Sequence, residues 1–458
     1  MKVIVCGAGQ VGFNIAHHLA GEDNDITVID QRPELIRKLN DSLDVRSVLG
    51  HASYPSVLEQ AGAGDADLIV AVTAVDEVNM VACQVAHSLF DLPTKIARIR
   101  SQAYLQPAWS RLFAPERLPI DVIISPEIEV ARAIRRRMEV PGTTDMIPLA
   151  GDKVRLLGVR CLPDCPLINT PLRQLTVLFP DLSIVILAIL RDGVPVMPGP
   201  QDQMRPGDEV MFVADSSHVA RAMAAFGYDE PKARRVTILG GGNIGLFLAQ
   251  ELEASPSGIF SHLIEIDRKR AEMAADALSD TVVLNGDALD AALLEEAGVD
   301  SAETAIAVTN DDETNILAAL LAKHRGCKRV MALVNKTDYG SLTATLGIDV
   351  LVSPRAITVS RILQHVRRGR IHAIHSILDG FGELIEADAL ETSGLVGKPL
   401  KDIKLPAGVR IGAVLHEGRV VMPQGNSVIQ AGDRVILFAI RSAVKKVEKM
   451  FSVRLEYF

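Results

Sequence analysis

The chain begins with short, continuous apolar runs that alternate with longer stretches in which apolar residues recur at helical spacing. Four of these runs are rich in Val, Ile and Leu and predict buried strands at 3–6, 25–29, 68–72 and 95–99. The longer stretches predict amphipathic helices, among them 33–40 and 78–90. Strands and helices in alternation predict a parallel sheet with helices on both faces.

Further along, the pattern becomes typical of a small β-rich module. An apolar run at 184–190 is separated from a second run at 194–197 by Asp192-Gly193, a dipeptide that favours a hairpin turn. The stretch 217–226 predicts a helix that closes this module. Residues 227–235, with a proline and several charges, are typical of a linker.

Both patterns occur twice along the chain. The segment Val3–Gly12 returns as Thr237–Gly245, and Val72–Asn79 returns as Val308–Asn315. Further matched pairs are Ser125-Pro126 with Ser353-Pro354, Pro171-Leu172 with Pro399-Leu400, and Gly207-Asp208 with Gly432-Asp433. The predicted fold is therefore α/β, a tandem pair of Rossmann-like parallel-sheet domains, each followed by a small α+β module. The expected domain limits are 1–124, 143–227, 233–352 and 371–456.

Length, composition and charge narrow the class of protein. The chain has 458 residues, 48% of them hydrophobic and 23% charged, so we expect several compact domains rather than extended disorder. Lys plus Arg number 48 against 57 Asp plus Glu, and the resulting net charge of -9 disfavours nucleic-acid binding. The apolar runs are far shorter than the roughly 20 residues that span a bilayer, so we expect no membrane insertion.

The start of the chain and its cysteines indicate a compartment. The first residues enter a strand directly, without the pattern of a signal peptide. The 5 cysteines are scattered and odd in number, which is typical of a reducing compartment, so we expect a cytoplasmic protein. Cys161 and Cys165 have no second Cys or His pair nearby in the sequence, so we expect no zinc site.

A glycine-rich loop follows the first predicted strand. Its spacing permits a tight turn and lets backbone N–H groups approach a pyrophosphate at the start of a helix. Asp30 ends the next strand, where a carboxylate can accept hydrogen bonds from the ribose hydroxyls and would repel a 2′-phosphate. The loop therefore predicts NAD(H) or an adenosine nucleotide, ATP or ADP, rather than NADP. Its candidate binding residues are Gly7, Ala8, Gly9, Gln10, Val11, Gly12 and Asp30.

The second half of the chain carries the same loop. Glu265 stands at the matching strand end, and Asp267, two residues later, competes for the same role. Either this loop binds a second nucleotide, or it is retained as part of the fold after its ligand has been lost. The candidate residues are Gly240, Gly241, Gly242, Asn243, Ile244, Gly245 and Glu265.

Other polar residues lie at strand ends that face the same clefts. The threonines after the fourth strand of each half either contact a ligand or cap the next helix. His51 and the equivalent Asp287 either contact a base or are ordinary turn residues. These candidates are His51, Thr73, Ala74, Asp287, Thr309 and Asn310.

Arginines distinguish the two halves. Arg98 and Arg100 alternate along a strand and leave the same face, so they form either a phosphate clamp or ordinary surface ion pairs. Their counterparts, Leu333 and Asn335, are uncharged, so the two sites cannot hold a polyphosphate equally well. Four more arginines within 132–137 indicate a solvated or interface face of a helix.

The order of these motifs, repeated twice, resembles the regulatory subunits of Trk potassium uptake systems, which are built from RCK or KTN domains. The motifs are the glycine loop, the acidic strand end, Gly-His-Ala or Gly-Asp-Ala, Thr-x-x-Asp-Glu-x-Asn and the β-rich module. The resemblance covers essentially the whole chain. It implies NAD(H), ATP or ADP as ligands, a homo-oligomeric ring, and a TrkH-like membrane potassium transporter subunit as partner. The family's contacts transfer to both glycine loops and to Asp30, Thr73, Arg98, Glu265 and Thr309.

The leading functional hypothesis is a nucleotide sensor that is peripheral to the inner face of the cell membrane. Nucleotide binding would shift the packing of the RCK units and so open or close the membrane subunit. An NAD-dependent oxidoreductase is an alternative, since the same loop serves dehydrogenases. However, none of the histidines has an evident catalytic partner in the sequence, and we expect no enzyme. A scaffold with vestigial loops is the third reading.

Overall fold

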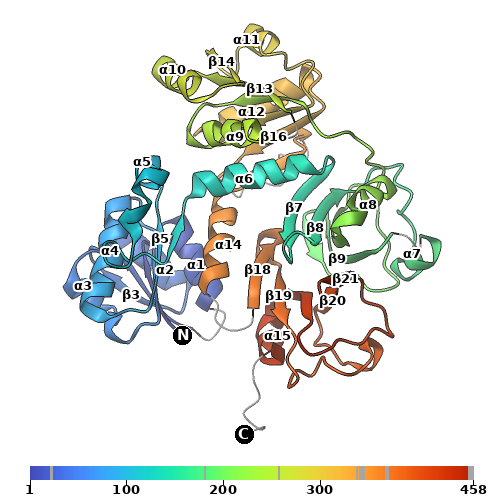
Figure 1. Cartoon of the computed structure of the whole chain (residues 1–458), viewed down its shortest axis with the longest axis horizontal. Coiled ribbons are helices and arrows are strands. Elements are labelled where there is room, and N and C mark those ends of the chain that lie inside the picture. Colours follow the sequence, from blue (N-terminus) through green and yellow to red (C-terminus); the bar gives the residue numbers. More distant parts are fainter. Residues whose placement is uncertain are drawn as a thin grey trace. The chain divides into compact units, whose positions relative to one another are not determined.

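The structure is a computed structural model that describes residues 1–20, 24–179, 182–255, 258–336, 339, 346–366 and 371–451. The chain divides into two compact units, Met1–Val130 with Pro354–Arg367 and Ala131–Ser353 with Arg368–Phe458 (Figure 1). Residue 456, the expected end of the last domain, lies outside the described residues.

The first unit is built on one six-stranded parallel sheet. Its strands are β1 (Lys2–Cys6), β2 (Asp25–Asp30), β3 (Arg46–Leu49), β4 (Leu68–Ala71), β5 (Thr94–Arg98) and β6 (Val122–Ile124). They are ordered β3-β2-β1-β4-β5-β6. Its helices are α1 (Gln10–Ala20), α2 (Pro33–Ser42), α3 (Pro55–Gln60), η1 (Ala63–Asp65), α4 (Asp76–Phe90), α5 (Gln102–Leu105), η2 (Pro107–Phe113) and α14 (Pro354–Val366).

Alternate residues of β1 show why both faces of this sheet are covered. Ile4 and Cys6 pack into one hydrophobic cluster with residues of α3 and α4. Val3 and Val5 pack into the opposite cluster with residues of α1. Because successive side chains of a strand point to opposite faces, an apolar run with no polar position requires a cover on each side. The predicted three-layer arrangement is confirmed.

Helix α14 belongs to the first unit although it comes from the second half of the sequence. Its residues Val359, Ile362 and Leu363 are buried in the same cluster as Ile15 and Leu19 of α1 (Figure 1). The corresponding helix of the first half, α6 (Pro126–Glu139), starts in the first unit and continues into the second.

The second unit contains a second parallel sheet of the same design. Its strands are β12 (Arg235–Leu239), β13 (Phe260–Glu265), β14 (Val282–Asn285), β15 (Thr304–Ala307), β16 (Arg329–Leu333) and β17 (Val350–Val352), in the order β14-β13-β12-β15-β16-β17. Its helices are α9 (Asn243–Glu253), α10 (Arg268–Ala277), α11 (Ala291–Glu296) and α12 (Asp312–His324). The duplication predicted from the sequence is confirmed in the strand order.

Two five-stranded antiparallel sheets complete the second unit. The first has β7 (Thr143–Leu149), β8 (Val154–Arg160), β9 (Ile184–Arg191), β10 (Val194–Val196) and β11 (Glu209–Asp215), with helices α7 (Leu172–Leu178), η3 (Ser216–His218) and α8 (Val219–Ala225). The second has β18 (Ile371–Ile377), β19 (Gly382–Asp388), β20 (Val409–His416), β21 (Arg419–Val421) and β22 (Arg434–Ile440), with helices η5 (Leu378–Gly380), η6 (Leu400–Asp402), η7 (Arg441–Ala443) and α15 (Val444–Phe451). Their orders, β10-β9-β11-β8-β7 and β18-β19-β22-β20-β21, are equivalent.

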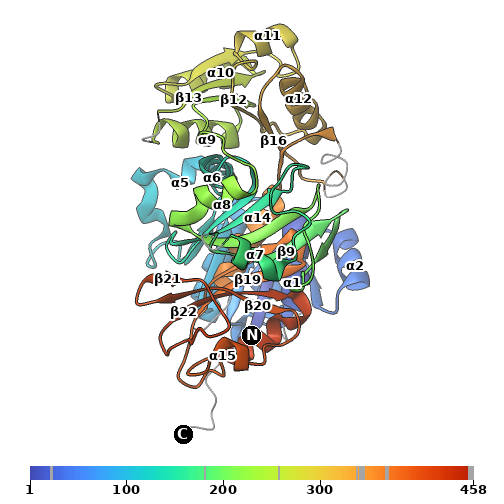
Figure 2. The same ribbon diagram turned by 90° about the vertical axis from the view of Figure 1, so that its right-hand side faces the viewer.

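The two antiparallel sheets share a hydrophobic core, and Figure 2 shows β9 close to β20. Leu187 and Val213 of the first sheet are buried in one cluster with Leu384 and Phe438 of the second. Arg410 donates to the carbonyl oxygens of Ile186, at 2.5 Å, and Pro198. Burial of these apolar side chains stabilises the pair as one body.

The arginines of α6 form an interface within the second unit. Arg135 Nε lies 3.2 Å from Glu251 Oε2 of α9, and Arg137 pairs with Asp145 at 2.5 Å. From β16, the buried Arg329 donates to the carbonyl oxygens of Arg137 and Thr143. Burial lowers the pKa of Arg329 to about 10. Of the two interpretations of this arginine-rich helix face, a solvated face or an interface, the structure supports an interface, formed within the chain.

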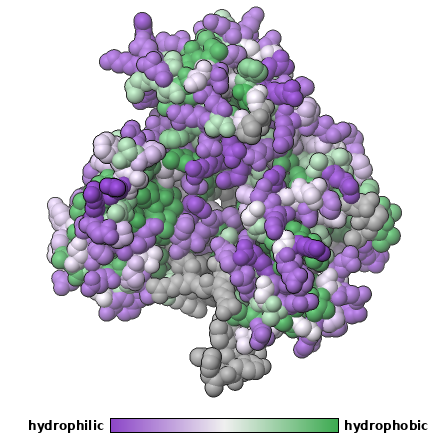
Figure 3. Space-filling model, viewed as in Figure 1, coloured by the Kyte–Doolittle hydropathy of each residue, from purple (hydrophilic) through white to green (hydrophobic). Residues whose placement is uncertain are grey.

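The face of the molecule in Figure 3 is largely hydrophilic, with apolar residues gathered in separate patches. Among the described residues, none of the helices is both long enough and apolar enough to cross a membrane.

Candidate functional site

The first glycine loop joins β1 to α1 and contains three glycines with different roles. Gly7 has a φ of +109°, in the left-handed region that favours glycine, and a Cβ on it would come within 3.1 Å of Thr73 N. A Cβ on Gly12 would overlap the carbonyl oxygen of Gly7. Gly9 has an ordinary φ, and a Cβ on it would meet no atom within 4 Å. The fold requires glycine at the first and last positions but not at the middle one.

The carboxylate at the end of β2 holds this loop. Asp30 Oδ2 accepts from the N–H of Ala8 at 2.7 Å, and Oδ1 accepts from the N–H of Arg32 at 2.9 Å. In the second unit, Glu265 accepts from Gly241 N–H at 2.8 Å and from Asp267 N–H at 2.9 Å. Of Glu265 and Asp267, it is Glu265 that occupies the position equivalent to Asp30.

The two loops compensate for the different lengths of these carboxylates. A Cβ on Gly241 would come within 2.8 Å of Glu265 Cβ, whereas the first unit combines Ala8 with the shorter Asp30. The second loop otherwise repeats the first: Gly240 has a φ of +117°, and a Cβ on Gly245 would overlap Gly240 O. Gly242 has a φ of −66° and open space around it.

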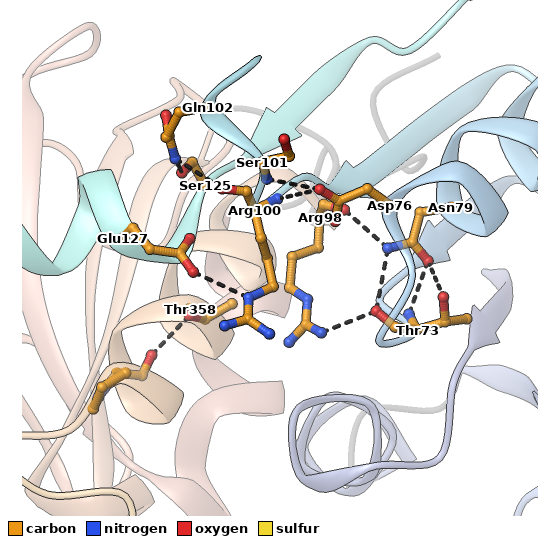
Figure 4. A network of polar contacts seen from close by, with 11 residues as sticks. Thr73, Asp76, Asn79, Arg98, Arg100, Ser101, Gln102, Ser125, Glu127 and Thr358 are labelled. Atoms are coloured by element: carbon orange, nitrogen blue, oxygen red, sulfur yellow. Dashed lines mark hydrogen bonds and ion pairs between the residues drawn. The ribbon is translucent and has the colours of Figure 1, made fainter. Parts of the chain in front are cut away.

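Thr73 lies beside the glycine loop and is held by a buried asparagine (Figure 4). Asn79 Oδ1 accepts from Thr73 N–H at 2.8 Å and lies 2.7 Å from Thr73 Oγ1. Asn79 Nδ2 donates to Arg98 O at 2.9 Å. Thr309 and Asn315 repeat this arrangement at 2.7 Å for both Oδ1 contacts. The threonine hydroxyls therefore have partners inside the protein, and their backbone forms the wall of the loop.

A second buried acidic residue turns the chain after β5. Asp76 Oδ2 accepts from the N–H groups of Arg100 and Ser101 at 2.9 and 2.7 Å. The strand consequently ends at Arg98, one residue earlier than expected. Asp312 makes the same bonds to Asn335 and Lys336. Asp76, Asn79 and their counterparts all belong to the repeated Thr-x-x-Asp-Glu-x-Asn motif, yet none of them is among the predicted site residues.

The side chains of Arg98 and Arg100 point in the same direction (Figure 4). Arg98 donates to Thr73 O at 2.9 Å, and its Nε is buried without a hydrogen-bond partner among the described residues. Burial, and then repulsion from Arg100, lower the pKa of Arg98. Arg100 Nε donates to Glu127 Oε1 at 3.0 Å, whereas Glu127 Oε2 is buried and unpartnered among the described residues. An anion beside Arg98 would relieve this repulsion.

The second unit has a different set of charges. Leu333 and Asn335 replace the two arginines, and Lys336 instead pairs with Glu313 at 2.7 Å. Hydrogen bonds from Lys336 and then Tyr339 lower the pKa of Glu313 to about 2. At the acidic strand end, Asp267 takes the place of Arg32. The carboxyl edge of the second parallel sheet therefore carries fewer positive side chains among the candidate positions than that of the first.

His51 and Asp287 are both turn residues in the structure. His51 Nδ1 lies 2.8 Å from Ser53 Oγ, and Asp287 Oδ1 accepts from Leu289 N–H at 2.9 Å. Both residues remain close to the acidic strand ends, because Gly50 N–H donates to Asp30 O and Gly286 N–H to Glu265 O, both at 3.0 Å.

Most of the remaining candidates lie at the carboxyl edges of the same two parallel sheets. Those on the first turns of α1 and α9 or in the loops after β4 and β15 are Gln10, Val11, Ala74, Asn243, Ile244 and Asn310. Each half thus brings its predicted residues to the carboxyl edge of one parallel sheet, the edge at which ligands of such folds bind. A separate cavity of about 70 Å³ is lined by Met138, Glu230 and Arg329 among others, and by none of the candidates.

Comparisons with known proteins agree with this layout. The TrkA-N domain model matches residues 3–126 and 236–354, and the TrkA-C domain model matches residues 156–227 and 384–452. The Trk system potassium uptake protein TrkA of Azorhizobium caulinodans is 53% identical over 458 residues, all of both chains. The TrkA proteins of Halomonas elongata and Vibrio alginolyticus are 43% and 42% identical, covering 100% and 98% of both chains.

Solved structures share the fold. The crystal structure of the GsuK RCK domain has a TM-score of 0.59 at 18% identity and covers 99% of this chain and 95% of its own. The GsuK channel bound to NAD has a TM-score of 0.58 at 18% identity, covering 99% and 79%. Full-length identity, matched domain models and the doubled RCK fold together show that the chain belongs to the TrkA family of Trk system potassium uptake proteins, which are regulatory subunits rather than enzymes.

Proposed function

We propose that the protein senses nucleotides and regulates a membrane potassium transporter subunit of the TrkH type. It binds NAD(H), ATP or ADP at the carboxyl edges of its parallel sheets, through the residues of the two clefts. Bound ligand changes the packing of the RCK units, and this change opens or closes the transporter. The protein acts in the cytoplasm, at the inner face of the membrane, without inserting into it and without binding nucleic acid.

The observation that carries the nucleotide proposal is the glycine at the middle of each loop. Gly9 and Gly242 need glycine neither for φ nor for space within the protein. Glycine precedes a helix here, but Ser or Asn would cap that helix at least as well. A residue without a side chain at this point favours close approach of a ligand to the backbone. A glycine that the fold itself does not need favours a working sensor over a scaffold with vestigial loops.

A homo-oligomeric ring is part of the same proposal. Val81 and Leu89, on α4, are 44% and 60% exposed, and Trp109 of η2 is 58% exposed. Exposed apolar side chains on α4 and η2 support contact with another subunit. A ligand that binds two ring states with different affinity shifts the balance between them, which is the physical basis of the proposed gating.

Replacing Gly9 by serine tests the carrying observation. Since Ser caps a helix well and a Cβ has open space here, we expect Gly9→Ser to keep its stability within about 1 kcal/mol. Nucleotide affinity in the first unit should fall about tenfold or more, a loss of at least about 1.4 kcal/mol. Calorimetric titration with NADH, ATP and ADP measures nucleotide binding to both units together. The part of the binding that Gly242→Ser removes belongs to the second unit.

Two results would contradict the proposed function. If the parent protein bound none of the three nucleotides, it would be a scaffold. If it oxidised NADH together with a small substrate, it would be an enzyme. Co-purification with a membrane potassium transporter, with and without ATP, tests the partner.

Arg98 should set the difference between ATP and ADP. Because an arginine contributes a charge-assisted hydrogen bond to the additional phosphate, Arg98→Ala should reduce the ratio of ATP to ADP affinity in the first unit about tenfold. Arg46→Ala is the matched control. This exposed arginine is the first residue of β3, so it lies at the amino edge of the sheet, away from the candidate residues at the carboxyl edge. Equal ratios in Arg98→Ala and the parent would reject the clamp.

A further inference from the structure

Two of the cysteines share one loop of the first antiparallel sheet. Cys161 directly follows the last residue of β8, and Cys165 lies four positions later. Both side chains are buried in the same hydrophobic cluster, at 1% and 3% exposure. The neighbours of Cys165 in sequence, Asp164 and Pro166, are exposed, so only a thin cover separates its thiol from solvent.

The backbone of this loop is fixed by its own hydrogen bonds. Cys161 N–H donates to Asp208 O, and Gly207 N–H donates to Cys161 O, both at 2.8 Å. Cys165 N–H donates to Leu162 O at 3.1 Å, which folds the loop back on itself. As a result the two thiols meet, and that of Cys161 donates a hydrogen bond to the sulfur of Cys165.

The second antiparallel sheet has the same loop without cysteines. Ala389 and Ser393 stand where the first loop has its two cysteines, and they make the same backbone hydrogen bonds. Ala389 N–H donates to Asp433 O at 2.7 Å, and Ser393 N–H donates to Leu390 O at 2.9 Å. The loop therefore folds without a thiol at either position, and folding alone does not account for the cysteine pair.

The same comparison shows that the loop presents backbone donors to the second position. In the second sheet, Leu395 N–H donates to Ser393 Oγ at 3.2 Å. The equivalent N–H of the first sheet, that of Leu167, donates to the sulfur of Cys165. The hydrogen bond from the Cys161 thiol, together with such backbone donors, outweighs burial and lowers the pKa of Cys165. The loop thus favours a thiolate at this position.

The other three cysteines are held in the thiol form. Cys6 and Cys83 lie in the core of the first parallel sheet and Cys327 in that of the second. Burial raises the pKa of all three, that of Cys83 to about 12. Because the thiolate is the nucleophilic form of cysteine, Cys165 is the cysteine of this chain best suited to react.

From these observations we propose that Cys161 and Cys165 are a peroxide-sensitive pair that closes a reversible disulfide in the loop after β8. Disulfides in a reducing compartment are typically transient and redox-sensing. The oxidant is a hydroperoxide, such as hydrogen peroxide, which is small enough to reach a thiol beneath a thin cover. This input is separate from nucleotide binding, because the loop belongs to an antiparallel sheet and contains none of the nucleotide candidates.

The reaction has two steps. The Cys165 thiolate attacks one oxygen of hydrogen peroxide, so an S–O bond forms, the O–O bond breaks, and the leaving hydroxide takes up a proton to become water. The sulfur of Cys161 then attacks the sulfenic acid of Cys165, so the S–S bond forms, the S–O bond breaks, and hydroxide leaves with the Cys161 proton as water. Two thiols are oxidised by two electrons, and one peroxide is reduced to two waters.

One tryptic peptide reports the reaction, because cleavage after Arg160 and Arg173 places both cysteines in the segment 161–173. The reduced full chain is treated with hydrogen peroxide at neutral pH, alkylated and digested. By mass spectrometry the peptide should become lighter by two hydrogen atoms and resist alkylation, and dithiothreitol should reverse both changes. Its oxidation should be about tenfold or more faster than that of Cys327.

Single variants separate the two roles. Cys161→Ala removes the second thiol, so Cys165 should stop at the sulfenic acid, which dimedone traps. Cys165→Ser should leave Cys161 unmodified. Both new residues occur at the equivalent positions of the second loop, so both variants should fold, which circular dichroism checks. Cys327→Ala is the matched control and should form the disulfide at the rate of the parent.

The pH dependence gives a readout that exposure alone would not imitate. Since the pKa of Cys165 is lowered, the oxidation rate should reach its plateau below pH of about 8.5, the ordinary pKa of a cysteine. A rate that still rises through that pH overturns the thiolate assignment. A 161–173 peptide that remains fully open to alkylation after peroxide treatment, or a disulfide that joins other cysteines, overturns the pair.

Discussion

Gly12→Ala should destabilise the first unit by about 3 kcal/mol, because the new methyl group would overlap the carbonyl oxygen of Gly7. The overlapping atom is backbone, so relief requires α1 to move away from β1. Alanine raises helix propensity by about 1 kcal/mol, which is too little to offset that displacement. Gly245→Ala should have the same effect in the second unit, where the new methyl group would overlap Gly240 O.

Chemical denaturation followed by circular dichroism measures this loss. Gly64→Ala is the control, because a Cβ there meets no atom within 4 Å and the φ of Gly64 is ordinary. This control should be neutral, or stabilising by about 0.5 kcal/mol. Equal unfolding midpoints for Gly12→Ala and Gly64→Ala would show that the loop and helix are not in the close contact described here.

Asn79→Ala should destabilise the first unit by a similar amount, about 3 kcal/mol. Asn79 is fully buried and its amide satisfies the N–H of Thr73 and the carbonyl oxygen of Arg98. Alanine would leave these groups without a partner, and each buried unsatisfied group costs about 1–3 kcal/mol. Since the same amide joins the loop after β4 to the end of β5, the variant should also loosen Arg98 and weaken nucleotide binding.

The control for this variant is Asn14→Ala. Asn14 makes an exposed hydrogen bond to Gln10 O at 2.6 Å on α1, and its loss should change stability by about 0.5 kcal/mol or less. Thermal unfolding and calorimetric titration together separate the loss of folding from the loss of binding. If Asn79→Ala unfolds at the temperature of the parent, the amide does not organise the cleft.

Much of the site could be predicted because its parts are local in sequence. The glycine loop, Asp30 and Glu265 stand at strand ends that the apolar runs mark directly, and the structure brings each set to one sheet edge. Arg98 and Arg100 were selected for alternation along one strand, whereas Arg100 lies beyond β5 and reaches its position through Asp76. The alternation of residues along the strand could not reveal that Asp76, rather than strand geometry, sets the direction of Arg100.

By itself, the sequence determined the duplicated order of elements, the parallel sheets and the places of the glycine turns, because strand and helix periodicities and glycine's freedom are local properties of a chain. Tertiary structure decided that α14 packs against α1, that Asn79 and Asp76 connect the loops, and that Leu49 lies beside Asp30. These contacts join residues distant in sequence. A pattern of apolar spacing states that a face is buried or exposed, and only the folded chain determines what that face meets.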